Sequence, residues 1–298
     1  MSFQTFMFKT IARKSDAKRD ANLVVPDNIH MDRDIDYLGN GDKWNLLDVY
    51  YEKHTEGVQP TIVSIHGGGF IYGTKEIYKH YGVYLAGLGY TFVNFNYHLA
   101  PKAKFPSQLT EINQVMEWVV KNGEEYHIDI NNVFLVGDSA GAQMCSHYAA
   151  IATNPDFEKE FAFTVPKELK IRAIGLNCGM YTFDPNSAEG PMAKMNKDLY
   201  KMYFGKDTSS IAKKIDVLGH ITKDYPPSYI MTSYYDFLRE NAEPMYHFLQ
   251  EKGVDSVYKC YGKEGQEYMG HVCHVNMNLA EAKQINQDEV AFFEKYIV

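Results

Sequence analysis

Short runs of apolar, often β-branched residues alternate along the chain with longer stretches of helix-forming sequence. Continuous apolar runs of this length are typical of strands that are buried on both faces of a sheet. The pattern predicts strands at residues 45–52, 61–65, 90–96, 133–136, 171–176, 228–233 and 257–261, and helices at 76–88, 109–122, 241–252 and 280–296. Strands that alternate with helices predict an α/β fold, with a mostly parallel central sheet flanked by helices on both faces.

Two segments fall outside this alternation. Residues 1–40 are polar and irregular, with one short predicted helix at residues 3–12. Residues 183–215 are polar, contain methionine and tyrosine, and have helix-like sequence at 192–204. An insertion between two sheet strands could fold over the strand ends as a lid, or it could be a surface excursion without a role. We therefore expect one α/β domain over residues 1–298, with residues 183–215 as a cap insertion.

The chain has 298 residues, enough for one large core, and its 45% hydrophobic and 23% charged residues are typical of a globular protein. The net charge of −8 argues against a nucleic-acid partner or an anionic membrane surface. No apolar run approaches the roughly 20 residues that a membrane span needs. The prediction is a protein without nucleic-acid partners or membrane spans.

Cellular location is predicted from the cysteines and from the first residues of the chain. The four cysteines are scattered without a C-x-x-C pair, which favours reduced, mostly buried thiols. Lys9, Arg13 and Lys14 precede no apolar segment of the kind found in a signal peptide. Both observations predict a cytoplasmic protein.

The most informative stretch is a G-x-S-x-G sequence from Gly137 to Gly141, which follows the predicted strand 133–136 and precedes helix-forming sequence. This order is that of a nucleophile elbow, where a sharp strand-to-helix turn holds a serine at its tip. Gly137 and Gly141 suit the turn because strand and helix nearly touch there. The alternative is a glycine-rich turn that contains Ser139 by chance.

A second glycine-rich stretch, His66-Gly67-Gly68-Gly69-Phe70, follows the strand predicted at 61–65. Acyl transfer needs backbone N–H groups that converge on a developing oxyanion, and glycines allow that close approach. We expect the donors to be the N–H groups of Gly68, Gly69 and Ala140. A phosphate-binding loop is the alternative, but neither G-x-x-x-x-G-K-[ST] nor G-x-G-x-x-G spacing is present. His66 is predicted to be structural.

With these motifs, the chain resembles the hormone-sensitive-lipase-like, HGGG-type esterases of the α/β-hydrolase superfamily. It also carries Tyr97-His-Leu-Ala-Pro101 followed by Phe105-Pro106, similar to the family's Y-R-L-A-P…F-P, with His98 where arginine is usual. The resemblance runs from about residue 60 to the C-terminus. It implies an α/β-hydrolase fold and ester hydrolysis by a serine nucleophile, without a cofactor or a metal.

A serine hydroxyl needs a base, and the base needs an orienting acid; in this fold the chain order is Ser, then Asp or Glu, then His. Asp236 ends the strand predicted at 228–233 and begins Asp-Phe-Leu-Arg, similar to the family's D-x-L-R. It could instead be a helix N-cap. Asp216 and Asp224 are rivals, but both precede the strand.

Two histidines follow the last predicted strand, in the sequence Gly270-His271-Val-Cys-His274. The family pattern is H-G-F, and the spacing to the last helix favours His271 as the base. Val272 and Cys273 replace the usual Gly and Phe, so His274 stays the alternative.

The sequence therefore predicts a serine carboxylic-ester hydrolase acting on a small-molecule ester. Phe70, Tyr72, Met180 and Tyr181 follow strand ends and are candidates for the substrate pocket. An amide hydrolase, such as a formamidase or small peptidase, and a non-catalytic binding relative are the alternatives. The pattern names no particular ester, and it leaves open both the acyl-chain length and a homodimer.

Overall fold

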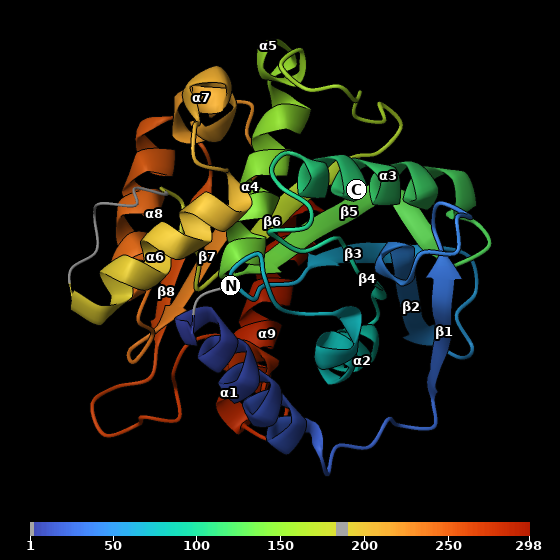
Figure 1. The fold of residues 1–298 in the computed structure, drawn as a ribbon. Helices are drawn as coiled ribbons and strands as arrows, with labels where there is room; N and C mark the ends of the chain where they lie inside the picture. Colours follow the sequence, from blue (N-terminus) through green and yellow to red (C-terminus); the bar gives the residue numbers. More distant parts are fainter. Residues whose placement is uncertain (1–2, 183–189) are drawn as a thin grey trace.

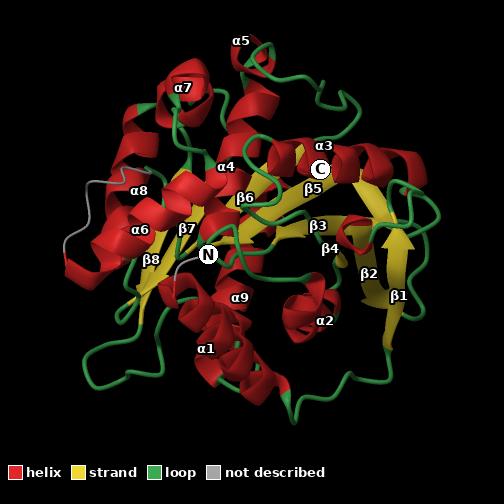
Figure 2. Cartoon of the chain, viewed as in Figure 1, coloured by secondary structure: helices red, strands yellow, loops and turns green. Residues whose placement is uncertain are grey.

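The computed structural model describes residues 3–182 and 190–298. Within these ranges, eight strands form one twisted sheet in the order β1-β2-β4-β3-β5-β6-β7-β8 (Figures 1 and 2). The strands are β1 (Ile29–Asp36), β2 (Leu46–Glu52), β3 (Gln59–Ile65), β4 (Thr91–Phe95), β5 (Ile128–Asp138), β6 (Ile171–Asn177), β7 (Ser228–Ser233) and β8 (Ser256–Tyr261). All pairs from β4 to β8 are parallel, whereas β2 pairs antiparallel with both β1 and β4. The predicted mostly parallel α/β sheet is confirmed.

Helices cover both faces of the sheet. Those described are α1 (Phe3–Asp20), α2 (Lys79–Ala86), α3 (Ser107–Asn122), α4 (Ala140–Thr153), α5 (Pro155–Glu158), α6 (Gly190–Tyr203), α7 (Ala212–Ile215), α8 (Ala242–Glu251) and α9 (Ala280–Phe293). In Figure 1, α3, α4 and α8 lie above the sheet, and α2 and α9 lie below it. The side chains follow the same division, since α3, α4 and α8 contribute to one buried cluster and α2 and α9 to another.

The central strand β5 shows why continuous apolar runs correctly predicted the strands of the sheet. Successive side chains of a strand point to opposite faces. Accordingly, Val133 and Leu135 pack with α3, α4 and α8, while Phe134 and Val136 pack with α2 and α9. All four are at most 1% exposed. A strand that is buried on both faces has no polar face, so its sequence does not alternate.

The first forty residues are more regular than predicted. The expected short helix at residues 3–12 is the 18-residue helix α1, and residues 29–36 form the edge strand β1. The prediction of an irregular segment was wrong because both elements are polar. The last two turns of α1 are largely charged, and β1 has the sequence IHMDRDID, whose side chains are mostly half-buried or exposed. Ile29 and Met31 alternate with polar residues and pack against the core, so the apolar face is short, and charged residues make up most of the rest of this edge strand.

The predicted insertion falls partly outside the described residues, since residues 183–189 are not described. Its described part begins with α6, which lies beside α1 (Figure 1). The ring of Tyr203, at the end of α6, stacks on Phe70 with a 3.8 Å centroid distance. Among the described residues, no helix is both long and apolar enough to cross a lipid bilayer.

Candidate active site

Ser139 lies at the turn between β5 and α4, with a backbone φ of 53° and ψ of −117°. This conformation is strained for a residue with a side chain, and the surroundings enforce it. A Cβ atom at Gly137 would collide with the backbone of Gly141, and one at Gly141 would collide with the carbonyl of Ile65. The two glycines therefore allow strand, turn and helix to pack together with the serine at the tip.

The glycine loop after β3 is equally constrained. Gly68 and Gly69 have φ angles of 107° and 59°, in the region that favours glycine. A Cβ atom at Gly68 would also collide with the carbonyl of Tyr72. Gly68, Gly69, Ser139 and Ala140 all line one cavity. The loop after β3 and the start of α4 therefore meet at a single site.

His66 begins this loop and is fully buried. Its Nδ1 atom lies 2.8 Å from the Gly67 carbonyl oxygen, and its ring stacks on Tyr97 at 4.0 Å between centroids. The Tyr97 hydroxyl donates a 2.6 Å hydrogen bond to the His66 carbonyl. Burial lowers the pKa of His66 to about 4. A neutral ring with these contacts fits the predicted structural role.

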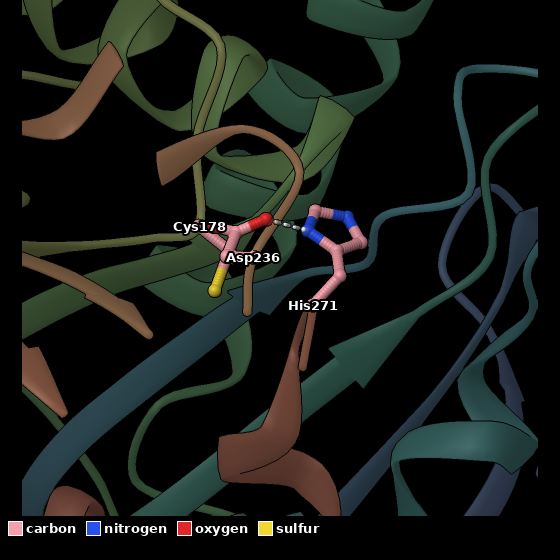
Figure 3. Close-up of side chains that lie close together, drawn as sticks. All are labelled: Cys178, Asp236 and His271. Atoms are coloured by element: carbon pink, nitrogen blue, oxygen red, sulfur yellow. Dashed lines mark hydrogen bonds and ion pairs between the residues drawn. The ribbon is translucent and has the colours of Figure 1, made fainter. Parts of the chain in front are cut away.

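The loops after β7 and β8 bring an aspartate and a histidine together. Tyr235 and Gly270 pair as an isolated parallel bridge, and the Ser233 hydroxyl donates to the Gly270 carbonyl at 2.8 Å. As a result, His271 Nδ1 lies 2.6 Å from Asp236 Oδ1, as Figure 3 shows. His271 lines the same cavity as Ser139.

Asp236 is 6% exposed, and its surroundings favour the ionised form. Burial alone would raise the pKa of this carboxyl, but the hydrogen bond and charge of His271 lower it below its usual value. The Leu238 N–H at 2.9 Å and the Thr232 hydroxyl at 2.8 Å lower the pKa further. An ionised carboxylate can only accept hydrogen bonds, so it places the neutral imidazole's proton on Nδ1 and leaves Nε2 free to act as a base.

The alternative histidine is in a different environment. His274 lies in a short 3₁₀ helix, η6 (Cys273–Val275), and is 1% exposed. Burial lowers the pKa of His274 to about 3, and its ring packs edge-on against Tyr81 at 5.4 Å. Among the described residues, those lining the Ser139 cavity do not include His274.

Val272, between the two histidines, has a φ of 52° and lies in the left-handed region. That conformation is unusual for a β-branched residue and costs on the order of 1–3 kcal/mol. It explains why a glycine is usual at this position in the family that the sequence resembles. In this chain the strained residue, Val272, directly follows His271 in the loop that places the imidazole beside Asp236.

Cys178 follows β6 and forms a cluster with Asp236 and His271 in which the potential metal-ligating atoms lie within 4.8 Å of one another (Figure 3). The donor chemistry fits a metal poorly. Burial raises the pKa of the Cys178 thiol well above its usual value, and the Asp236 carboxylate raises it further. The thiol therefore keeps its proton and hydrogen-bonds to the carboxylate. We interpret the cluster as hydrogen-bonded support for Asp236.

The cavity beside Ser139 has a volume of about 240 Å³ and is lined mainly by apolar side chains. Three of the four predicted pocket residues, Phe70, Tyr72 and Met180, line it. Tyr181 does not appear among the described lining residues. It is buried, and its hydroxyl donates to the Leu176 carbonyl at 3.3 Å, within the core. Its ring packs against the backbone of Gly179, so it turns away from the cavity.

Helix α1 forms part of the cavity wall, which the sequence reasoning missed. Phe8, Ala12, Ser15, Asp16 and Arg19 all line the cavity. Their spacing places them on one face of a helix, and this was the signal that could have identified them. Helix α6 adds a further part of the wall through Met195, Asn196 and Leu199.

Two contacts attach α1 to the rest of the site. The Tyr72 hydroxyl donates to Asp16 at 2.7 Å, and the Arg19 guanidinium donates to the Ile77 carbonyl at 2.5 Å. Both contacts join α1 to the segment that follows the glycine loop. The position of α1 therefore depends on the same segment that shapes the loop.

His98 occupies the position where the family usually has arginine, and like an arginine it contacts carboxylates. Its Nδ1 atom lies 2.5 Å from a Glu111 carboxylate oxygen, and its Nε2 lies 3.2 Å from Asp42. Burial opposes the charged form, but these hydrogen bonds and charges together raise the pKa of His98.

With this geometry established, comparison with known proteins identifies the family. The BD-FAE family model matches residues 47–242, which is most of the chain. The chain belongs to the BD-FAE family. Together with the HGGG loop and the G-x-S-x-G turn, this match confirms the predicted α/β-hydrolase of the hormone-sensitive-lipase-like type.

The relatives of this BD-FAE chain agree with the assignment. It is 24% identical to an alpha/beta hydrolase of Acanthamoeba polyphaga mimivirus over 80% of this chain and 70% of the relative. It is also 24% identical to the acetyl esterase of Salmonella typhi over 79% of this chain and 72% of that protein.

Among solved structures, esterase B from Lactobacillus rhamnosis shares the fold with a TM-score of 0.90 and 22% identity, covering 98% of this chain and 94% of that one. The same esterase was also solved with a tributyrin phosphonate inhibitor. The curated relatives and the family together support a carboxylesterase-type hydrolase.

Proposed function

We propose that the protein is a serine carboxylesterase with Ser139 as nucleophile, His271 as general base and Asp236 as the orienting acid. The observation that carries the proposal is the convergence of three separate segments on one cavity. Ser139, the Gly68–Gly69 loop and His271 all line it, and His271 is paired with Asp236 at 2.6 Å. The same elements recur in serine hydrolases on unrelated folds because the chemistry requires them.

The proposed reaction has two halves. In the first, the Ser139 hydroxyl oxygen attacks the ester carbonyl carbon as its proton moves to His271 Nε2. The N–H groups of Gly68, Gly69 and Ala140 stabilise the oxyanion. The carbon–oxygen bond to the alcohol then breaks, and the imidazolium returns the proton to the leaving alcohol. In the second half, water loses a proton to His271, cleaves the acyl-enzyme and regenerates Ser139.

The cavity supports a small substrate with apolar groups. Its volume of about 240 Å³ is slightly below that of most ligand pockets, which usually measure ~300–1,000 Å³. Helices α1 and α6 close it from outside the strand ends, and Leu199 packs beside Gly69. We propose that these two helices form the cap over the site. The acetyl esterase relative is consistent with a short acyl group.

The first test is hydrolysis of p-nitrophenyl acetate, butyrate, octanoate and palmitate by the wild type and by Ser139→Ala. We expect wild-type activity to be highest on the shorter acyl chains. Loss of the nucleophile should lower kcat by a factor of about 10⁴ or more, as for other serine hydrolases. A fluorophosphonate should label the wild type but not the variant. Equal rates for the two proteins would refute the nucleophile, and an unlabelled, inactive wild type would favour a binding protein.

The second test separates the two histidines. His271→Ala should reduce kcat by about 10³-fold or more, because no other base replaces it. His274→Ala serves as the matched control, since it removes an imidazole only three residues away. If only the His274 variant were inactive, the base would be misassigned.

Matched p-nitrophenyl esters and p-nitroanilides would distinguish an esterase from an amide hydrolase. The cytoplasmic location and a homodimer stay predictions.

A further inference from the structure

The residue just before the nucleophile makes contacts that the proposed mechanism does not use. The Asp138 carboxyl is 3% exposed and hydrogen-bonds to the Gly67 N–H and to the Tyr78 hydroxyl. The Gly67 N–H also donates to Tyr78 Oη at 2.9 Å. Tyr78 ends the 3₁₀ helix η2 (Lys75–Tyr78), which follows the glycine loop, and is 5% exposed. Asp138, Gly67 and Tyr78 therefore form a buried triangle of neighbouring groups, in which the Gly67–Tyr78 hydrogen bond forms one side and the Asp138 carboxylate lies against the other two groups.

The triangle joins the two halves of the site directly. Asp138 precedes the nucleophile on β5, and Gly67 precedes the two proposed oxyanion donors, Gly68 and Gly69. A Cβ atom at Gly67 would collide with the Asp138 carboxylate, so the aspartate lies against the glycine backbone. Asp138 and Tyr78 line the cavity but are almost fully buried, and hydrogen bonds in such a low-dielectric environment are stronger than surface ones.

We propose that Asp138 and Tyr78 are positioning residues that hold the glycine loop at a fixed distance from Ser139, so that the Gly68 and Gly69 N–H groups already point at the future oxyanion. This inference rests on the proposed serine esterase function. The physical reason is that such donors stabilise the transition state only when they need no rearrangement during the reaction. A displacement of about 1 Å in such a site can cost a factor of about 100 in rate.

The groups around Asp138 are consistent with an anchoring role. Burial raises the pKa of Asp138 to about 6, and the Tyr78 hydroxyl, the His271 charge, the Gly67 N–H and the Arg19 charge limit that rise. Burial raises the pKa values of Tyr81 and Tyr97, and the charge of the Asp138 carboxylate raises them further. At neutral pH the carboxyl is therefore mostly an acceptor that binds both donors.

The decisive variant is Tyr78→Phe, which removes one hydroxyl and retains the buried ring. We expect kcat on p-nitrophenyl acetate to fall by about 10- to 100-fold, below the loss for removing an oxyanion donor itself, with KM nearly unchanged. The affinity for phenyl trifluoromethyl ketone, which forms a tetrahedral adduct with the serine, should fall by a similar factor. Substrate binding in the ground state does not need the oxyanion geometry, which is why KM is spared.

Tyr81→Phe is the matched control. Tyr81 is also a buried tyrosine, 2% exposed, and packs against Tyr78 at 6.5 Å between ring centroids. Its hydroxyl is directed to Glu289, on α9, and not to the glycine loop. We expect the Tyr81→Phe variant to retain the wild-type kcat and the wild-type affinity for the ketone. If the two variants behaved alike, or if Tyr78→Phe lost only thermal stability, the positioning role would be overturned.

Asp138→Asn provides a second, independent variant. It should also lower kcat and ketone affinity. The double variant Asp138→Asn/Tyr78→Phe should have about the same kcat as the less active of the two single variants, because both residues act through one loop position. Fully additive losses would contradict a shared role. Failure of the proposed function looks different, since a wild type without esterase activity and without ketone binding would overturn both proposals together.

Discussion

Two buried carboxylates lie at the site, and their surroundings shift their pKa values in opposite directions. Asp236 is 6% exposed, and its pKa is lowered although burial opposes this. Asp138 is 3% exposed, and burial raises its pKa to about 6. Asp138 is the more deeply buried of the two, so the difference lies both in desolvation and in the hydrogen-bonding partners.

Asp236 contacts an imidazole that can carry a positive charge, together with two neutral donors, the Thr232 hydroxyl and the Leu238 N–H. The direct contacts of Asp138 are neutral: the Tyr78 hydroxyl and the Gly67 N–H. His271 and Arg19 act on it only through their charges. Opposite charge in direct contact offsets desolvation, whereas neutral donors do so only in part. The first carboxylate is thus suited to support charge during the reaction, and the second to hold backbone in place.

The largest expected effect comes from removing the charge of Asp236. Asp236→Asn should lower kcat by about 10³- to 10⁴-fold, because an amide stabilises neither the required tautomer nor the imidazolium. Steady-state kinetics with p-nitrophenyl acetate measures this, with circular dichroism as a check of folding. If Asp138→Asn lost as much activity as Asp236→Asn, the two carboxylates would not have distinct roles.

The next effect concerns stability as a function of pH. The folded-state pKa of Asp138, about 6, is above the usual value of 3.8 for an aspartate, so its contribution to stability is present below pH 4 and is lost as pH rises through 6. This loss amounts to about 3 kcal/mol at most. Relative to the wild type, Asp138→Asn should therefore become more stable between pH 4.5 and 7.5, on the order of 2 kcal/mol.

Urea unfolding at these two pH values would measure the change in the free energy of unfolding. Tyr81→Phe is again a suitable control, because it leaves Asp138 in place. A variant that became less stable relative to the wild type as pH rose would contradict the assigned direction of the pKa shift.

The smallest effect should come from Thr232→Val, which removes one neutral donor from Asp236 and preserves the side-chain shape. One neutral hydrogen bond contributes about 1 kcal/mol, so kcat should fall by less than about tenfold. The acid limb of the kcat/KM profile should persist, since His271 still contacts Asp236. A loss as large as that of Asp236→Asn would show that the imidazole contact alone does not hold the carboxylate ionised.

Local patterns in the sequence predicted the sheet and both glycine-rich turns because they depend on neighbouring residues. The strand-to-helix turn at Ser139 needs small residues two positions away on each side, and those requirements are visible as Gly137 and Gly141. The helix α1 was underestimated because its cavity-facing residues are interspersed with lysines and arginines. What makes that face significant is its contact with Tyr72 and Ile77, more than fifty residues away.

The sequence by itself determined that a serine and a glycine loop each follow a buried strand, since the chemistry of the turn restricts which residues fit. Only the tertiary structure decided which histidine lies beside Asp236. His271 and His274 are three positions apart in sequence, but their side chains differ in burial and in orientation. The partnership of Asp138 with Tyr78 likewise joins segments sixty residues apart. Such contacts follow from how the strands are ordered in the sheet, and no local pattern records that order.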